Sequence, residues 1–104
     1  MGARPFVVEA AATDVQEAFQ SAVAEAQWLY GHVGDTGTIA EKDAVRVVTP
    51  PRPMTDEEKR AWVEAILHDG ADDPGLDWID DKWAPAAAIR LDAGRWLFFG
   101  WAAS

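Results

Sequence analysis

The chain has 104 residues, of which 49% are hydrophobic and 26% are charged, a composition typical of one globular domain spanning residues 1–104. It contains no cysteine, which excludes disulfides, thiolate metal sites and a cysteine nucleophile. The net charge of −9 argues against direct binding to a nucleic-acid backbone or to an anionic membrane, because both need clustered lysine and arginine.

No apolar leader opens the sequence, and no apolar run approaches the roughly 18 residues of a membrane span. Together with the lack of cysteine, this leads us to expect a cytoplasmic protein. The acidity is local, since residues 55–81 hold ten acidic and two basic residues, a net charge of −8. Such a segment is typical of a solvated face, and the alternative is a surface for a basic partner.

In chain order, residues 6–10 form a β-prone run that predicts a first strand. Apolar residues then recur at helical spacing, behind an N-cap at Thr13 or Asp14 and before Gly31 as the closing glycine. The apolar positions of this helix are Val15, Ala18, Phe19, Ala22, Val23, Ala26, Leu29 and Tyr30. Trp28 lies outside this stripe. Either a loop or the chain terminus covers it, or it is an exposed aromatic anchor for a partner.

Residues 38–41 and 44–49 predict two strands joined by a tight turn at Lys42 and Asp43. The economical interpretation is a hairpin. Prolines follow immediately, and because proline cannot donate a ladder hydrogen bond they end the second strand.

A second helix is predicted from Thr55 to about His68. Thr55 and Glu58 have the spacing of a capping box, in which each side chain accepts a hydrogen bond from the other residue's amide. The helix is expected to close at a glycine, Gly70, and to bury Trp62, Ala65 and Ile66.

Residues 72–82 predict a turn followed by an irregular loop with a helical turn, and residues 86–91 and 95–101 predict two strands around a turn at Gly94. The last strand is apolar on both faces, which fits either a central strand covered on both sides or a sheet that offers one face to a partner. We expect a two-layer α+β fold ordered β-α-β-β-α-β-β. Its four-to-five-stranded antiparallel sheet would carry both helices on one face.

The most unusual patch combines acidic and aromatic residues over positions 77–83. It comprises Asp77, Trp78, Asp80, Asp81 and Trp83. Charges around aromatic side chains are common in protein interfaces, so the patch is a candidate partner-binding site together with Trp28. The alternative is a loop held to the core by its two tryptophans. No catalytic residue, cofactor or metal is assigned.

A glycine-rich loop over residues 31–38 has the pattern G-x-x-G-x-x-G-T. It lacks the lysine and the strand-to-helix position of a phosphate-binding loop, and a structural turn is the favoured interpretation. His32, Asp35 and Glu41 leave open a small enzyme or metal site near this loop.

Four segments carry a family resemblance: Tyr30-Gly31-His32, then Gly-Thr-Ile-Ala-Glu-Lys at 37–42, Asp-Lys-Trp-Ala-Pro at 81–85 and Leu-Phe-Phe-Gly-Trp-Ala-Ala-Ser at 97–104. They resemble a set of small uncharacterised proteins encoded by bacteriophages and other mobile elements. Here Asp35 stands where a tyrosine is common in that set, and Ala84 stands where a glycine is common, so no tyrosine-dependent role carries over. The resemblance implies an accessory protein acting in a host cytoplasm and transfers no catalytic residue.

These observations favour a non-enzymatic module that binds a host or phage protein through an exposed sheet face or through the loop at residues 77–83. One alternative is a nucleic-acid mimic that places the acids of residues 56–81 in the basic groove of a DNA-binding or defence enzyme. Homodimerisation through the sheet face is equally compatible with the sequence.

Overall fold

The computed structural model describes residues 2–31 and 34–104, and its elements follow the order β-α-β-α-β-β with two 3₁₀ helices inserted. The strands are β1 (Ala3–Ala11), β2 (Val45–Val47), β3 (Ala86–Arg90) and β4 (Arg95–Ala103). The helices are α1 (Val15–Tyr30), α2 (Asp56–Asp69), and the 3₁₀ helices η1 (Ile39–Glu41) and η2 (Pro74–Asp80). None of the helices in the described ranges is long and apolar enough to cross a membrane.

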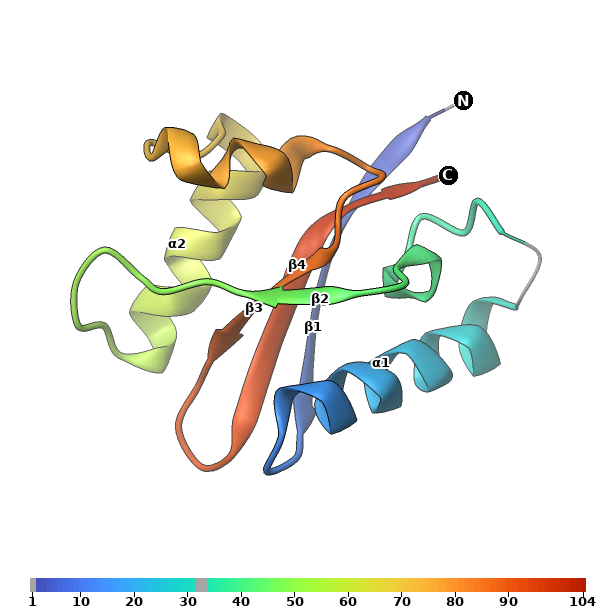
Figure 1. Cartoon of the computed structure of the whole chain (residues 1–104), viewed down its shortest axis with the longest axis horizontal. Helices are drawn as coiled ribbons and strands as arrows, with labels where there is room; N and C mark the ends of the chain where they lie inside the picture. Colours follow the sequence, from blue (N-terminus) through green and yellow to red (C-terminus); the bar gives the residue numbers. More distant parts are fainter. Residues whose placement is uncertain (1, 32–33) are drawn as a thin grey trace.

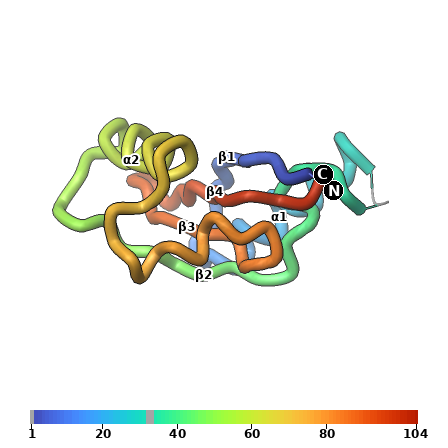
Figure 2. Tube along the Cα trace, turned by 90° about the horizontal axis from the view of Figure 1, so that it is seen from above, coloured from blue at the N-terminus to red at the C-terminus, as the bar shows by residue number. Residues whose placement is uncertain are grey.

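The four strands form one open sheet in the order β1-β4-β3-β2, which confirms the α+β class. β4 pairs antiparallel with both β1 and β3, whereas β2 pairs parallel with β3. Figure 2 shows β1 and β2 as the two outer strands. The expectation of a wholly antiparallel sheet is therefore wrong. The parallel pair arises because α2 and η2 connect β2 to β3, and a helical crossover returns the chain in the same direction.

The predicted hairpin over residues 38–49 is also wrong, because its first half is helical. Residues 39–41 form η1, and the Thr38 hydroxyl caps this helix by accepting a hydrogen bond from the Ala40 amide at 3.2 Å. The backbone groups of this segment therefore form hydrogen bonds within the segment and are not free to pair with a neighbouring strand. The second half does form a strand, but β2 pairs with β3 instead.

The two helices lie on opposite faces of the sheet, so the prediction that both cover one face is wrong (Figure 1). Alternate residues of a strand point to opposite faces. Phe98 and Ala88 pack against α1, where Phe98 meets Phe19 with ring centroids 6.0 Å apart. Leu97 and Phe99 pack against α2. β4 is therefore the central strand covered on both sides, and among the described residues neither face of β4 is open to a partner.

Both long helices begin and end as their sequences predict. Asp14 caps α1 by accepting from the Gln16 amide at 2.7 Å, and the capping box of Thr55 and Glu58 opens α2. Gly31 and Gly70 close the helices at positive φ. In α2 the buried residues are Val63, Ile66 and Leu67, whereas Trp62 is half-buried and Ala65, predicted to be buried, is exposed.

One glycine in β4 makes room for an aromatic ring. Phe6 on β1 pairs with Gly100, whose φ is 154°, and a Cβ added to Gly100 would lie 3.3 Å from the Phe6 ring. The ring therefore lies over the glycine, on the face that α1 covers.

Candidate functional site

The acidic patch predicted at residues 77–83 is built on η2 and the loop that follows it. The Asp73 side chain caps η2 by accepting from the Gly75 amide at 2.8 Å, and Pro74 fixes the first helical position. Ile79 is the residue that attaches η2 to the core, since its side chain is 2% exposed against the α2 face. Asp77 and Asp80 flank that anchor and are exposed, so the helix presents acids to solvent.

The two tryptophans of the patch have different environments. Trp78 is half-buried against the core, its ring lies 5.0 Å from the Arg46 guanidinium, and its indole Nε1 is buried without a hydrogen-bond partner among the described residues. Trp83 is 68% exposed, with the Lys82 ammonium 5.2 Å from its ring. The alternative in which both tryptophans hold the loop to the core therefore applies to Trp78 alone, and Trp83 is free to contact a partner.

The loop that carries Trp83 is held by a buried lysine. Lys42 is 5% exposed, and its Nζ donates to the carbonyl oxygens of Lys82 at 3.0 Å and Ala84 at 2.7 Å. Burial lowers the pKa of Lys42, and the negative charge of Asp81 partly opposes this shift. The sequence interpretation placed Lys42 in a tight turn and missed this role. A lysine at the end of a short helix such as η1 carries no signal that reveals a partner 40 residues away.

Residues 37–42, 81–85 and 97–104, three of the segments on which the predicted family resemblance is based, meet at this corner of the fold. The amide of Gly37 donates to the Ala103 carbonyl at 2.7 Å, while Lys42 holds the backbone at 82 and 84. Gly37 has φ of 71°, and a Cβ there would lie 2.9 Å from Arg4 Cδ. Glycine is thus required both by the backbone conformation and by the space. These contacts give Gly37 and Lys42 a structural role.

Glu41 completes the same corner by closing the loop before η1. Its carboxylate accepts hydrogen bonds from the Asp35 amide at 3.0 Å, the Thr36 amide at 3.1 Å and the Thr36 hydroxyl at 2.7 Å. Burial raises the pKa of Glu41, but these hydrogen bonds outweigh it and hold the pKa below its ordinary value of 4.5.

Because the folded state holds Glu41 ionised, the contribution of this residue to stability is present above pH 4.5. It is lost as the pH falls through the lowered folded value, since the unfolded chain takes up the proton first. We expect Glu41→Gln to lower the free energy of unfolding by about 1 kcal/mol at pH 7. The variant is also expected to lose less stability than the wild type as the pH falls below 4.5. Urea denaturation at a series of pH values measures both effects. Asp43→Asn, at an exposed neighbouring acid, controls for the change in net charge. If Glu41→Gln loses stability with falling pH as the wild type does, the carboxylate of Glu41 does not contribute to stability through these hydrogen bonds.

A metal site around His32, Asp35 and Glu41 gains no support from the described geometry. His32 lies outside the described residues, and the Glu41 oxygens are already engaged by the loop. Within residues 2–31 and 34–104, no group of three or more histidine, aspartate or glutamate side chains is arranged to hold a metal ion.

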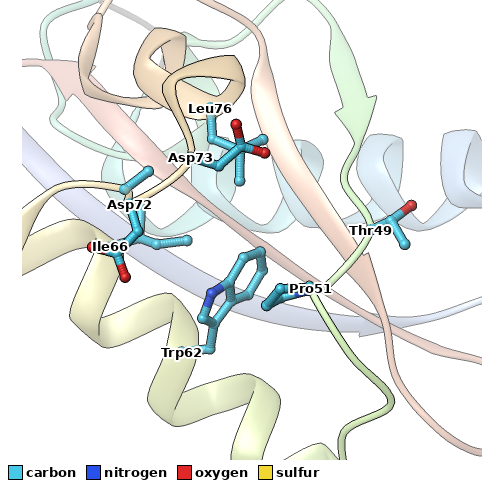
Figure 3. Close-up of a pocket in the computed structure, with 8 residues that line it drawn as sticks. Thr49, Pro51, Trp62, Ile66, Asp72, Asp73 and Leu76 are labelled. Carbon is cyan, nitrogen blue, oxygen red and sulfur yellow. The ribbon is translucent and has the colours of Figure 1, made fainter.

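An apolar cavity of about 150 Å³ lies between α2, the beginning of η2 and the connector after β2 (Figure 3). Trp62 and Ile66 of α2, Ala71 and Leu76 supply its apolar wall. Asp72 and Asp73 line it with carboxylates, and Thr49 and Pro51 close it from the connector. A space of roughly 150 Å³ holds one benzene-sized group, which is smaller than the usual site for a cofactor. Sequence reasoning missed this cavity, because its walls come from three separate segments.

Trp28 is 84% exposed, as one of its two interpretations requires. It belongs to α1, which covers the face of the sheet opposite to η2. The structure therefore brings Asp77, Trp78, Asp80, Asp81 and Trp83 into one region and leaves Trp28 outside it.

Comparison with known proteins identifies no relative. No protein-family model, no curated protein and no solved structure matches the chain.

Proposed function

We propose that this chain is a non-enzymatic protein-binding module, and that its partner contacts the η2 surface. This surface consists of the cavity beside Trp62 together with the exposed acids Asp72, Asp73, Asp77, Asp80 and Asp81. The observation that carries the proposal is an apolar cavity bordered by carboxylates. Such a site favours an apolar or aromatic side chain with lysine or arginine next to it.

The charges around the cavity support a basic partner. None of the five acids of the η2 surface forms an ion pair with the described part of the chain. Among the other acids, Glu9 pairs with Arg60 and Arg95, and Asp56 also pairs with Arg95. The five acids of the η2 surface lie within residues 72–81 and together give it a negative field, which attracts a basic surface.

The family resemblance extends this proposal to an accessory protein of a phage or mobile element that acts on a host or phage protein in the host cytoplasm. Trp83 adds an exposed aromatic contact beyond the end of η2. Its loop is held in place by Lys42 and by the Asp81 side chain, which accepts from the Trp83 amide at 2.8 Å. Binding a partner therefore costs this loop little further conformational entropy.

The test is a pull-down from bacterial lysate with variants that separate shape from charge. Ala71→Leu fills the cavity from its own wall, whereas Asp72→Asn/Asp77→Asn removes two of the acids. The matched control, Glu17→Gln/Asp92→Asn, changes the net charge from −9 to −7 in the same way, and its two exposed positions lie on α1 and in the turn between β3 and β4. We expect both η2 variants to lose the same captured proteins and the control to retain them, as quantified by mass spectrometry.

A salt step distinguishes the proposed module from nucleic-acid mimicry. A mimic binds through charge alone, so its partner would be a DNA-binding enzyme that is released by salt and unaffected by Ala71→Leu. An anchored partner remains bound through the salt step and is lost in Ala71→Leu. If the η2 variants capture the same proteins as the wild type, the η2 surface is not the binding site.

A further inference from the structure

β1 is an open edge of the sheet. All nine of its residues pair with β4, and no strand of residues 2–31 and 34–104 lies on its other side (Figure 2). An edge strand of this length presents a row of unpaired backbone groups that another strand is able to join.

The register shows which residues of β1 direct their backbone groups outward. Gly2 and Ser104 exchange both hydrogen bonds, at 3.3 and 3.2 Å, and the Ala12 amide donates to the Gly94 carbonyl. Because hydrogen-bonded pairs alternate along an antiparallel ladder, the even-numbered residues of β1 bond to β4. The odd-numbered residues therefore turn their N–H and C=O groups away from the sheet; these are Ala3, Pro5, Val7, Glu9 and Ala11.

Pro5 restricts where a new strand is able to pair. It occupies an outward position, where its missing N–H breaks no bond to β4 but removes one donor from the open edge. The intact part of the edge thus runs from Val7 to Ala11, and there Val7 is 38% exposed.

An apolar groove lies beside this part of the edge. The groove, of about 240 Å³, is lined by Val8 on β1 and by Ala22, Ala26, Leu29 and Tyr30 on α1. Leu29 is 55% exposed and Tyr30 is 61% exposed, although the helical pattern assigns both to the buried stripe. The last turn of α1 therefore presents apolar side chains that the described part of the fold leaves exposed.

Glu25 supplies the charge of this groove. It lines the groove one helical turn before Leu29 and forms no ion pair within the described ranges. Glu9 also lines the groove, but its carboxylate is held by Arg60 at 3.0 Å and by Arg95 at 3.1 Å. The free negative charge at the groove is thus that of Glu25.

We propose that an extended segment of another protein adds to β1 as a fifth strand. Its backbone pairs with Val7, Glu9 and Ala11, and the side chain opposite Val8 enters the groove against Ala26 and Leu29. Strand addition of this kind obtains affinity from the main chain and specificity from alternate side chains. The segment therefore carries an apolar residue at the position opposite Val8 and a lysine or arginine within two residues of it, facing Glu25.

A second copy of this chain fits the groove less well. Each copy carries a net charge of −9, so two copies repel one another. In an antiparallel β1–β1 pair, the side chains opposite Val8 would be even-numbered residues of the other copy. Phe6 of that set is only 7% exposed in its own core, and Val8 and Ala10 pack against the same core. Arg4 is exposed, but its stem lies against Gly37 and it brings no apolar side chain to the groove.

The test uses a displayed library of random nine-residue peptides selected against the whole protein. We expect the selected sequences to share one large apolar residue with a lysine or arginine within two positions. Amide hydrogen exchange then gives the structural readout. In the free protein the amides of Val7, Glu9 and Ala11 exchange rapidly, and the selected peptide slows them by at least about tenfold.

Three variants locate the site on the same helix and strand. Leu29→Glu places a charge in the groove, and Val7→Pro removes one outward donor without touching the bonds to β4. Each is expected to weaken peptide binding by at least about tenfold. Trp28→Glu adds the same charge one residue away on the exposed side of α1 and is expected to leave the affinity unchanged.

Several results would overturn the proposal: no enriched sequence, selected peptides that leave the three amides rapidly exchanging, or equal binding to Leu29→Glu. Amides that are already protected without peptide, in a protein that sediments as a dimer, would identify a second copy as the occupant. Because the groove and the η2 surface lie on opposite faces, Ala71→Leu is expected to bind the peptide normally, and each proposal is able to fail without the other.

Discussion

Phe98→Ala and Phe99→Ala are each expected to lower the free energy of unfolding by about 3 to 5 kcal/mol, which is the usual result of removing a buried phenylalanine ring. The two residues are neighbours on β4, and both are 0% exposed. Phe98 lies beneath α1 and Phe99 beneath α2. Similar losses at the two positions would show that both faces of the sheet carry a packed core.

Urea denaturation of both variants measures this effect. Val47→Ala on β2 is the matched control, because its side chain is 51% exposed and its loss is expected to change stability by less than about 1 kcal/mol. A small effect at one of the two phenylalanines, beside a large effect at the other, would mean that one face is open in solution. That result would support the alternative in which the sheet offers one face to a partner.

Lys42→Met is expected to lower the free energy of unfolding by about 2 to 4 kcal/mol, although methionine fills much of the space of the lysine stem. The ammonium group of Lys42 satisfies two carbonyl oxygens, those of Lys82 and Ala84. Without it, both acceptors lose their partner in a poorly hydrated part of the loop. We also expect faster exchange of the Trp83 and Ala84 amides, because the loop loses its attachment to η1.

Lys59→Met provides the control for this prediction. Lys59 donates to one carbonyl, that of Arg90, at 2.7 Å in an exposed setting where water replaces the lost donor. Its loss is expected to cost no more than about 1 kcal/mol. If Lys42→Met is no more destabilising than Lys59→Met, Lys42 does not hold the loop in the way described.

Local signals in the sequence are sufficient for the helices and for the final hairpin. Asp14, the capping box at Thr55 and Glu58, Gly31 and Gly70 act on backbone groups within a few residues of themselves, so their effect is readable without the rest of the fold. The turn at Gly94 between β3 and β4 is of the same kind, with φ of 68°.

Some features of the candidate site depend on residues that are neighbours in sequence, and others depend on contacts between distant segments. The exposed acids at Asp77 and Asp80 follow from a short helix with a single buried side chain, Ile79, and the helical pattern alone places Trp28 outside the apolar stripe. The cavity beside Trp62 and the bonds of Lys42 join segments that are far apart in sequence. The pattern of apolar residues within any one of these segments therefore indicates neither the cavity nor the bonds of Lys42.

The sequence by itself determined an acidic α+β domain with two capped helices and a last strand that is apolar on both faces, because these features depend on composition and on neighbours within one or two turns. Only the tertiary structure decided that β2 pairs parallel with β3, that α1 and α2 take opposite faces, and that β1 stays open beside a groove. The physical reason is that strand pairing depends on which distant backbone groups remain unsatisfied, and helix placement depends on which distant apolar faces pack together. The side chains of Thr38 and Glu41 bond to the local backbone, and for this reason residues 38–41 do not pair as a strand.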